Sequence, residues 1–146
     1  MPKEDQEAIL TAESINNFTS EAYLKANDHF MVRHAGDVPT DESPEPLRRK
    51  KNRGEAAYLH AWGPNEFFPM GTLKTFDYTN KLKEIDVPVL ITSGADDLST
   101  PVVSKTMYDH IKNAKWELFA NSRHMPFVDE ERAYKKILRD WLASHD

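Results

Sequence analysis

The stretch that decides the fold is VPVLITSGADDLSTP, which runs from Val87 to Pro101. Its first part, over residues 87–92, is a short run of mostly apolar and β-branched residues ended by Ser93 and Gly94, the pattern of a buried parallel strand. Its last two residues, Thr100 and Pro101, are typical of a helix N-cap followed by proline at the first helical position. A strand that leads into a helix predicts one step of an α/β fold.

The same order repeats in the residues that follow. Residues 116–120 are predicted to form a second strand, and Asp129 is expected to open a last helix. Strand, helix, strand, helix over residues 81–146 predicts a βαβα unit with a parallel sheet and a right-handed crossover. Two strands alone would leave the edges of an apolar sheet open, so this region resembles the end of a larger α/β domain. The apolar residues of the last helix are spaced for burial on one face: Tyr134, Ile137, Leu138, Trp141 and Leu142.

Residues 1–80 have a different pattern, which predicts helices and loops. Ser20 is expected to cap a helix whose apolar face begins with Tyr23. A second helix is expected over residues 47–62, although Gly54 in its middle disfavours it. The segment 63–71 is too rich in glycine and proline for a regular element, but its large apolar residues predict that it packs. The chain therefore divides near residue 80.

The composition excludes several classes of site. The chain has 146 residues, which suits one domain, and its formal net charge of -5 disfavours a nucleic-acid partner. The basic run over residues 48–53 is interpreted as a solvated helix face. There is no cysteine, so disulfides and thiolate sites are excluded. No stretch resembles a signal peptide or a membrane span, and no His-Glu-x-x-His metal pattern occurs; we expect a cytoplasmic protein with no membrane partner.

Polar residues follow both predicted strands. Asp96 and Asp97 come after the first strand, and His124 comes after the second. Functional groups of open parallel sheets gather beyond the carboxyl ends of the strands, so an aspartate and this histidine are expected on one rim. Such a carboxylate would hold one imidazole nitrogen while the other nitrogen acts as a base.

The residues after both predicted strands resemble motifs of a known protein family. The second half resembles the end of an α/β-hydrolase, whose triad follows the chain order serine, acid, histidine. Gly-x-x-Asp-x-x-Thr-Pro resembles the loop that carries the acid, and Asn-Ser-x-His-Met-Pro resembles the loop that carries the histidine. The resemblance implies that Asp97, rather than Asp96, is the acid and that His124 is the base.

The first half narrows the resemblance to one family. GPNEFFPMGTLKTFD, followed by LKEIDVPVLITSG, closely resembles proline iminopeptidases, and FMVRH and MPKEDQEAI resemble their helical cap. The resemblance covers essentially the whole chain. It implies that residues 1–80 are a cap segment and residues 81–146 are the C-terminal part of the hydrolase core.

The family releases N-terminal residues, often proline, from short peptides, and some relatives act on amino-acid amides. Such an enzyme must bind a free α-ammonium group, which a carboxylate in a partly desolvated pocket does well. The resemblance implies that Glu66 supplies this carboxylate, with Asp28 or Glu21 as candidates for a second acid. It implies no metal or organic cofactor.

The chain departs from the family in one respect. The family's nucleophile lies in a Gly-x-Ser-x-Gly turn, and no serine of this sequence has that setting. The glycine-rich oxyanion loop is absent as well, so the chain resembles the C-terminal part of a serine aminopeptidase and should be inactive alone. One alternative is a non-catalytic fragment or a partner of a separate N-terminal half, and another is a different α/β-hydrolase, an esterase or amidase. Neither Ser99 nor Ser122 is expected to replace the nucleophile.

Plainer roles compete for each candidate residue. His124 could be a loop histidine with a satisfied hydrogen bond, and Asp97 could be a turn or capping carboxylate. Glu66 could be an exposed loop glutamate. The motifs and the strand order favour the catalytic pair over these readings, and the family match favours Glu66 as a ligand of ammonium.

Overall fold

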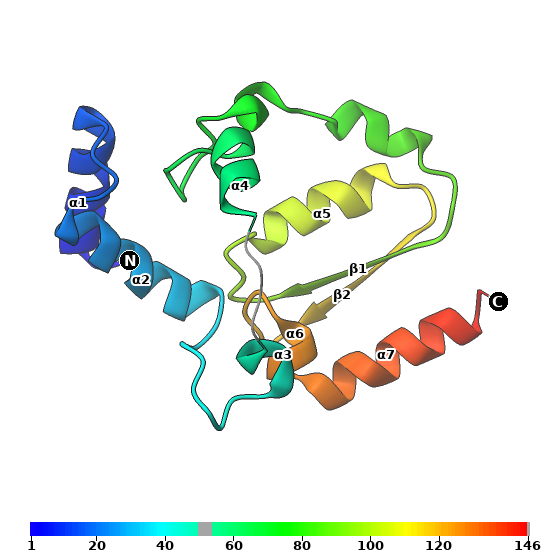
Figure 1. Ribbon diagram of the computed structural model, residues 1–146. Coiled ribbons are helices and arrows are strands. Elements are labelled where there is room, and N and C mark those ends of the chain that lie inside the picture. The colour runs from blue at the N-terminus through cyan, green and yellow to red at the C-terminus, as the bar shows by residue number, and fades with distance from the viewer. Residues whose placement is uncertain (50–53, 146) are drawn as a thin grey trace. The chain divides into compact units, whose positions relative to one another are not determined.

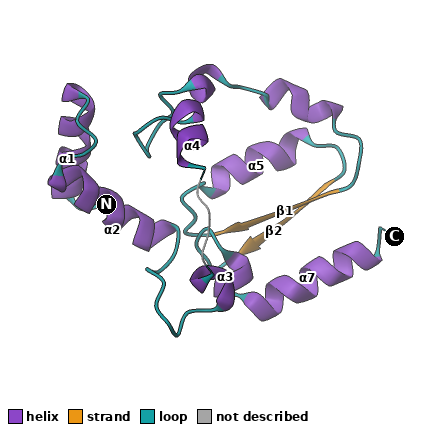
Figure 2. Ribbon diagram, viewed as in Figure 1, coloured by secondary structure: helices purple, strands orange, loops and turns teal. Residues whose placement is uncertain are grey.

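The computed structural model describes residues 1–49 and 54–145. The chain forms two compact units: one holds Met1–Val32 and Arg49–Asp77, and the other holds Arg33–Arg48 and Tyr78–Asp146. The first unit is helical and the second contains the sheet (Figures 1 and 2). The assignment of residues 1–80 to a cap stays a prediction.

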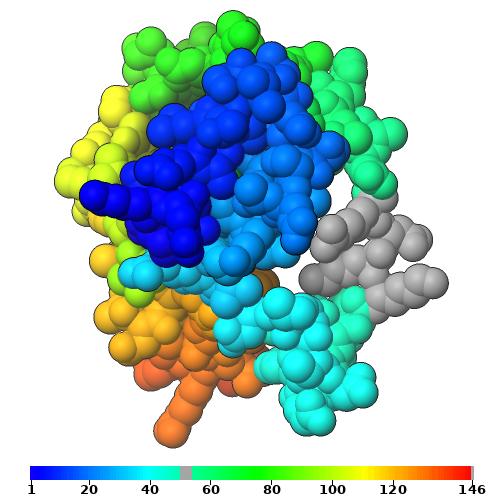
Figure 3. Space-filling model, turned by 90° about the vertical axis from the view of Figure 1, so that its left-hand side faces the viewer, coloured from blue at the N-terminus to red at the C-terminus, as the bar shows by residue number. Residues whose placement is uncertain are grey.

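The helical unit is built on α1 (Lys3–Ile15) and α2 (Glu21–His34), whose last two residues belong to the second unit. Side chains from both helices form one buried cluster, and Figure 3 shows these helices in blue. The Ser20 cap is confirmed, because the Tyr23 amide donates to the Ser20 hydroxyl at 3.3 Å. The cluster consists of Ile9, Ala12, Phe18, Tyr23 and Ala26.

The segment over residues 63–71 is irregular and packed, as expected. The ring of Phe67 contacts those of Tyr23 and Phe30, with centroids 6.1 and 5.1 Å apart. Gly63 has a φ of 104°, which favours glycine because a Cβ would be strained there. A short 3₁₀ helix, η1 (Thr72–Thr75), follows this segment.

The single helix expected over residues 47–62 is wrong. The structure has two short helices instead, α3 (Glu45–Arg48) in the second unit and α4 (Glu55–Ala61) in the first. Gly54 directly precedes α4, in keeping with the cost of glycine inside a helix. Of the basic run, Lys50, Lys51 and Arg53 lie outside the described residues.

The second unit contains the predicted parallel strands. After η2 (Thr79–Glu84) come β1 (Val89–Gly94), α5 (Pro101–His110) and β2 (Ala114–Phe119). The register pairs Val89 with Ala114 and Gly94 with Phe119. Pro88 has no N–H to donate to the ladder, which explains why β1 begins later than expected. Both strands end at the same rim, next to α6 (Figure 1).

The end of the chain differs from the expected single helix. Asp129 closes a short helix, α6 (Pro126–Asp129), and the last helix is α7 (Glu131–Ala143). Between them Glu130 has a φ of -127° and a ψ of 48°, outside the helical region. Tyr134 of α7 packs on Phe119 of β2, with ring centroids 5.7 Å apart. No residue of α7 is fully buried, so its apolar stripe stays half covered.

Candidate active site

Asp97 and His124 are in direct contact. His124 Nδ1 lies 2.8 Å from Asp97 Oδ1, although the residues are 27 positions apart. The Asp97 side chain is 7% exposed and that of His124 is 50% exposed. A carboxylate can only accept, so Nδ1 carries the shared proton when Asp97 is ionised. The other ring nitrogen, Nε2, has no hydrogen bond within the described residues, which leaves it available to a proton-bearing group.

The loop that carries Asp97 is fixed by backbone bonds to the neighbouring loop. The amide of Ala95 donates to the Phe119 carbonyl at 2.9 Å, and that of Asp96 donates to the Ser122 carbonyl at 3.1 Å. Asp97 Oδ1 also accepts from the Ser99 amide at 2.8 Å. This last bond is an aspartate turn, so the plainer role considered for Asp97 is present together with its contact to His124.

The loop that carries His124 is held by two acidic side chains. Glu130 Oε2 accepts from the Asn121 amide at 2.9 Å and from the Ser122 hydroxyl at 2.7 Å. Asp129 Oδ2 accepts from the Arg123 amide at 2.8 Å. Neither role was predicted from the sequence. The signal in the sequence was a pair of adjacent acidic residues a few positions after a loop whose backbone amides need hydrogen-bond acceptors.

Gly94 lies where the two loops cross. A Cβ built on it would overlap the carbonyl oxygens of Ser122 and Arg123. The strand must therefore end in glycine for the His124 loop to pass over it. This contact sets how closely the two loops approach.

Arg123 joins the His124 loop to the segment that follows α2. Its guanidinium donates to both carboxylate oxygens of Asp37, at 2.8 and 3.1 Å, and to Asp129 at 3.2 Å. These hydrogen bonds and the positive charge of Arg123 lower the pKa of Asp37. The same bonds raise the pKa of Arg123. Arg123 therefore stays charged and continues to bridge the two carboxylates.

Glu66 lies in the helical unit, in a separate network. The Tyr58 hydroxyl donates to Glu66 Oε2 at 2.8 Å, and the Glu66 amide donates to the buried Tyr23 hydroxyl at 3.0 Å. Burial, followed by the hydrogen bond to Glu66, raises the pKa of Tyr58 to about 12. Tyr58 therefore stays a donor to Glu66 throughout the neutral range.

Asn65 anchors the loop beneath Glu66. It is 0% exposed, and its Oδ1 accepts from the Tyr23 hydroxyl at 3.3 Å and the Phe67 amide at 2.9 Å. Its Nδ2 donates to Glu13 at 3.0 Å. A buried amide that is hydrogen-bonded through both its oxygen and its nitrogen fixes the backbone on either side of it. The candidate second acids, Asp28 and Glu21, lie exposed on α2.

Known proteins match this sequence along the full length of the chain. A proline iminopeptidase of Lactobacillus delbrueckii subsp. lactis is 55% identical over 146 residues, which is 100% of this chain and 49% of that protein. A proline iminopeptidase of Clostridium botulinum is 49% identical over 146 residues, which is 100% of this chain and 50% of that protein. The chain is homologous to the proline iminopeptidases. None of the family models compared with it matches.

Solved structures agree with this relationship. VinJ superimposes with a TM-score of 0.83 at 27% identity, covering 100% of this chain and 50% of VinJ. The proline iminopeptidase of Mycobacterium smegmatis superimposes with a TM-score of 0.81 at 26% identity, covering 99% of this chain and 49% of that one. The expected fold class is confirmed: the two parallel strands and their helices match the C-terminal half of an α/β-hydrolase. The chain spans about half the length of the proline iminopeptidases it matches.

The serines next to the pair differ from an exposed nucleophile. Ser122 is 2% exposed, and its hydroxyl is already bound to Glu130. Ser99 lies in the turn below Asp97, which its amide supports. Within the described residues, neither hydroxyl is hydrogen-bonded to the His124 ring, the contact that would activate an attacking serine.

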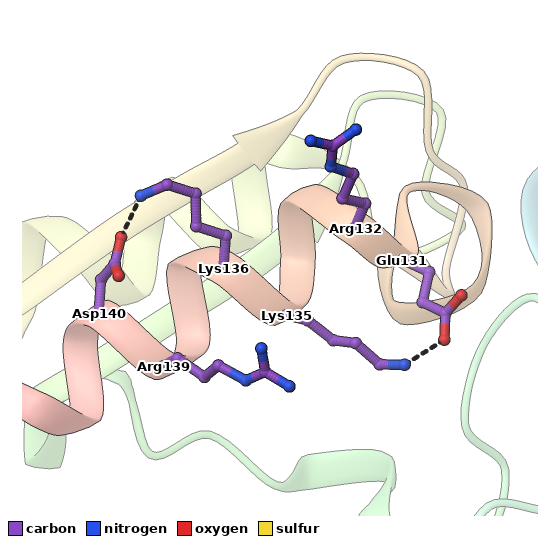
Figure 4. A pocket seen from close by; sticks show the side chains of 6 residues that line it. All are labelled: Glu131, Arg132, Lys135, Lys136, Arg139 and Asp140. Atoms are coloured by element: carbon purple, nitrogen blue, oxygen red, sulfur yellow. Dashed lines mark hydrogen bonds and ion pairs between the residues drawn. The ribbon is translucent and has the colours of Figure 1, made fainter.

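The described residues contain no group of side chains suited to a metal ion, and none of their helices is both long and apolar enough to cross a bilayer. A depression on α7 is lined by charged side chains alone and includes neither Asp97 nor His124 (Figure 4). Its lining residues are Glu131, Arg132, Lys135, Lys136, Arg139 and Asp140.

Proposed function

We propose that Asp97 and His124 are the acid and the base of a serine-hydrolase triad, and that the complete protein is a serine aminopeptidase of the proline iminopeptidase type. The observation that carries the proposal is the 2.8 Å contact between His124 Nδ1 and Asp97 Oδ1. A buried carboxylate behind a half-exposed imidazole is the arrangement such a pair needs. The homology to proline iminopeptidases supplies the reaction class.

The proposed mechanism follows from the two ring nitrogens. A serine from a segment outside this sequence attacks the acyl carbon, and Nε2 of His124 accepts the serine proton. The imidazolium then gives that proton to the leaving amine, and a water repeats the cycle on the acyl-enzyme. Asp97 holds the Nδ1 proton, which keeps the ring in the correct tautomer and stabilises the imidazolium.

Glu66 is proposed to bind the α-ammonium group of the substrate. Tyr58 occupies Oε2, while Oε1 has no hydrogen bond within the described residues. An ionised carboxylate with one open oxygen can accept a charge-assisted hydrogen bond from an ammonium group. The proposed substrates are short peptides or amino-acid amides with a free N-terminus, proline in the first place.

The complete site is proposed to need a partner segment that carries the nucleophile and the oxyanion donors. Two observations support this: the chain spans about half the length of its relatives, and the apolar stripe of α7 is only half covered. The partner is the N-terminal half of such an enzyme, in the same polypeptide or made separately.

A reconstitution experiment tests the proposal. The chain is produced together with the remaining N-terminal half of the Lactobacillus delbrueckii enzyme, and hydrolysis of proline p-nitroanilide is measured. We expect activity from the pair of halves and none from either half alone. Replacing His124→Ala or Asp97→Asn should lower kcat by about 10⁴-fold, as loss of a triad member does. Turnover by the chain alone that requires His124 would contradict the need for a partner.

A second substrate separates the aminopeptidase from an esterase or amidase. N-acetylproline p-nitroanilide has no free ammonium group, so the reconstituted enzyme should prefer the unblocked substrate by at least about ten-fold. Equal rates on the two compounds would favour a general amidase and remove the role given to Glu66.

A further inference from the structure

His34 contacts both loops of the Asp97–His124 pair. It is the last residue of α2 and belongs to the same compact unit as the two loops. Its Nδ1 lies 2.9 Å from the carbonyl oxygen of Asp96. Its own carbonyl oxygen accepts from the His124 amide at 3.0 Å. One residue therefore binds the backbone next to the acid and the backbone of the base.

These bonds close a ring of contacts. His34 holds Asp96, the adjacent Asp97 holds the His124 imidazole at 2.8 Å, and the His124 amide returns to His34. Each bond limits the freedom of the other two because the segments joined are short. The separation between the carboxylate and the imidazole is thus fixed by a third segment, as well as by the pair itself.

The side-chain bond of His34 has a defined direction. A carbonyl oxygen only accepts, so Nδ1 of His34 must carry the proton that is shared with Asp96. The bond therefore acts as a support for the backbone next to Asp97.

A second contact reinforces the attachment. Asp37, close behind His34, binds Arg123, which directly precedes His124, with distances of 2.8 and 3.1 Å. The segment after α2 thus meets the His124 loop at two points. Two attachments prevent the loop from pivoting about either one.

We propose that His34 is a positioning residue that holds His124 in register with Asp97. This inference rests on the proposed function of the pair. Catalytic groups displaced by about 1 Å lose much of their rate, so a residue that fixes two loops can affect kcat without touching the substrate. Nothing in the motifs around Asp97 or His124 points to it.

The test measures the tautomer of the His124 ring. In the ¹⁵N-histidine-labelled chain, ¹⁵N shifts report which nitrogen carries the proton. Wild type should show His124 protonated on Nδ1, and His34→Leu should lower that tautomer population at least two-fold. His34→Asn should restore it, because the asparagine amide places an N–H close to the position of Nδ1. An unchanged population in His34→Leu would overturn the inference.

Controls separate failure of the inference from failure of the proposed function. His110→Leu removes a similar bond, from Nδ1 to the Thr106 carbonyl at 2.8 Å, away from the pair, and should leave His124 unchanged. Asp97→Asn should change the His124 tautomer whatever His34 does. If it does not, the pair itself and the proposed triad are wrong.

A replacement for His34→Leu is needed if that variant does not fold. If His34→Leu is unfolded by circular dichroism, His34→Gln replaces it, because its amide is one methylene further out than that of His34→Asn. Equal His124 tautomer populations for the asparagine and glutamine variants would then overturn the inference. In the reconstituted enzyme, whichever of His34→Leu and His34→Gln is used should lower kcat about ten-fold with KM unchanged. A change in KM alone would also contradict a positioning role.

Discussion

Gly94 lies so close beneath the carbonyl oxygen of Arg123 that a Cβ on its backbone would overlap that oxygen. The last residue of β1 is thereby a spacer between the loop of the acid and the loop of the base. The geometry of Asp97 and His124 therefore depends on residue 94 having no Cβ.

Replacing Gly94→Ala should lower the free energy of unfolding by about 3 kcal/mol, because the overlap is with backbone that must shift. Chemical denaturation of the chain measures this. Gly54→Ala is the matched control, since a Cβ there meets only the Ala57 Cβ at 3.9 Å. Equal stability of the two variants would mean that the loops can separate without cost.

Glu130 should contribute to stability through the His124 loop. Glu130→Gln weakens two charge-assisted bonds, to the Asn121 amide and the Ser122 hydroxyl, and should lower the free energy of unfolding by about 2 kcal/mol. Glu131→Gln is the control, because Glu131 forms an exposed ion pair with Lys135 on α7. A larger effect at Glu131 would show that the loop does not depend on Glu130.

Tyr58 and Glu66 should affect substrate binding rather than chemistry. In the reconstituted enzyme, Glu66→Gln removes the proposed charge partner of the ammonium and should raise KM for proline p-nitroanilide at least about ten-fold. Tyr58→Phe leaves the carboxylate but frees it to turn, so a smaller rise is expected. Comparison with the N-acetylated substrate is the control, because neither change should alter its KM.

The stability contributed by Tyr58 should disappear at alkaline pH. Its pKa is raised from 10.0 to about 12 in the folded chain, mainly by burial and then by the bond to Glu66. Folding therefore favours the protonated phenol, so the contribution is complete below pH 10 and is lost as the pH rises toward about 12. Wild type should lose stability relative to Tyr58→Phe across that window. A constant difference between the two proteins would contradict the raised pKa of Tyr58 in the folded chain.

A contact between His124 and an aspartate after the first strand was predictable from local patterns, whereas the choice of Asp97 over Asp96 came from the resemblance to α/β-hydrolases. Each residue comes just after an apolar strand, and parallel strands end on one rim. The α/β class was predictable for the same reason. The limits of β1 and β2 differ from the expected ones by a few residues because hydrophobic patterns do not mark where the ladder of hydrogen bonds begins.

Other parts of the site depend on partners that a local pattern does not contain. His34 binds a backbone carbonyl 62 positions away, and carbonyls leave no signature in the sequence. The break between α6 and α7 arises because Asp129 and Glu130 turn back to bind the preceding loop. The Asp129 helix start that the pattern favoured was wrong for this reason.

The two-stranded sheet has a practical consequence for handling the isolated chain. In the part that the structure describes, each strand pairs on one side only, and the other side keeps unpaired amides and carbonyls. On β2, Lys115 and Glu117 act as charged gatekeepers, whereas β1 carries no charge from Val89 to Gly94. The outer edge of β1 is therefore the site at which one copy of the chain would pair with the next and aggregate. We expect Thr92→Lys to keep concentrated preparations of the isolated chain free of aggregate.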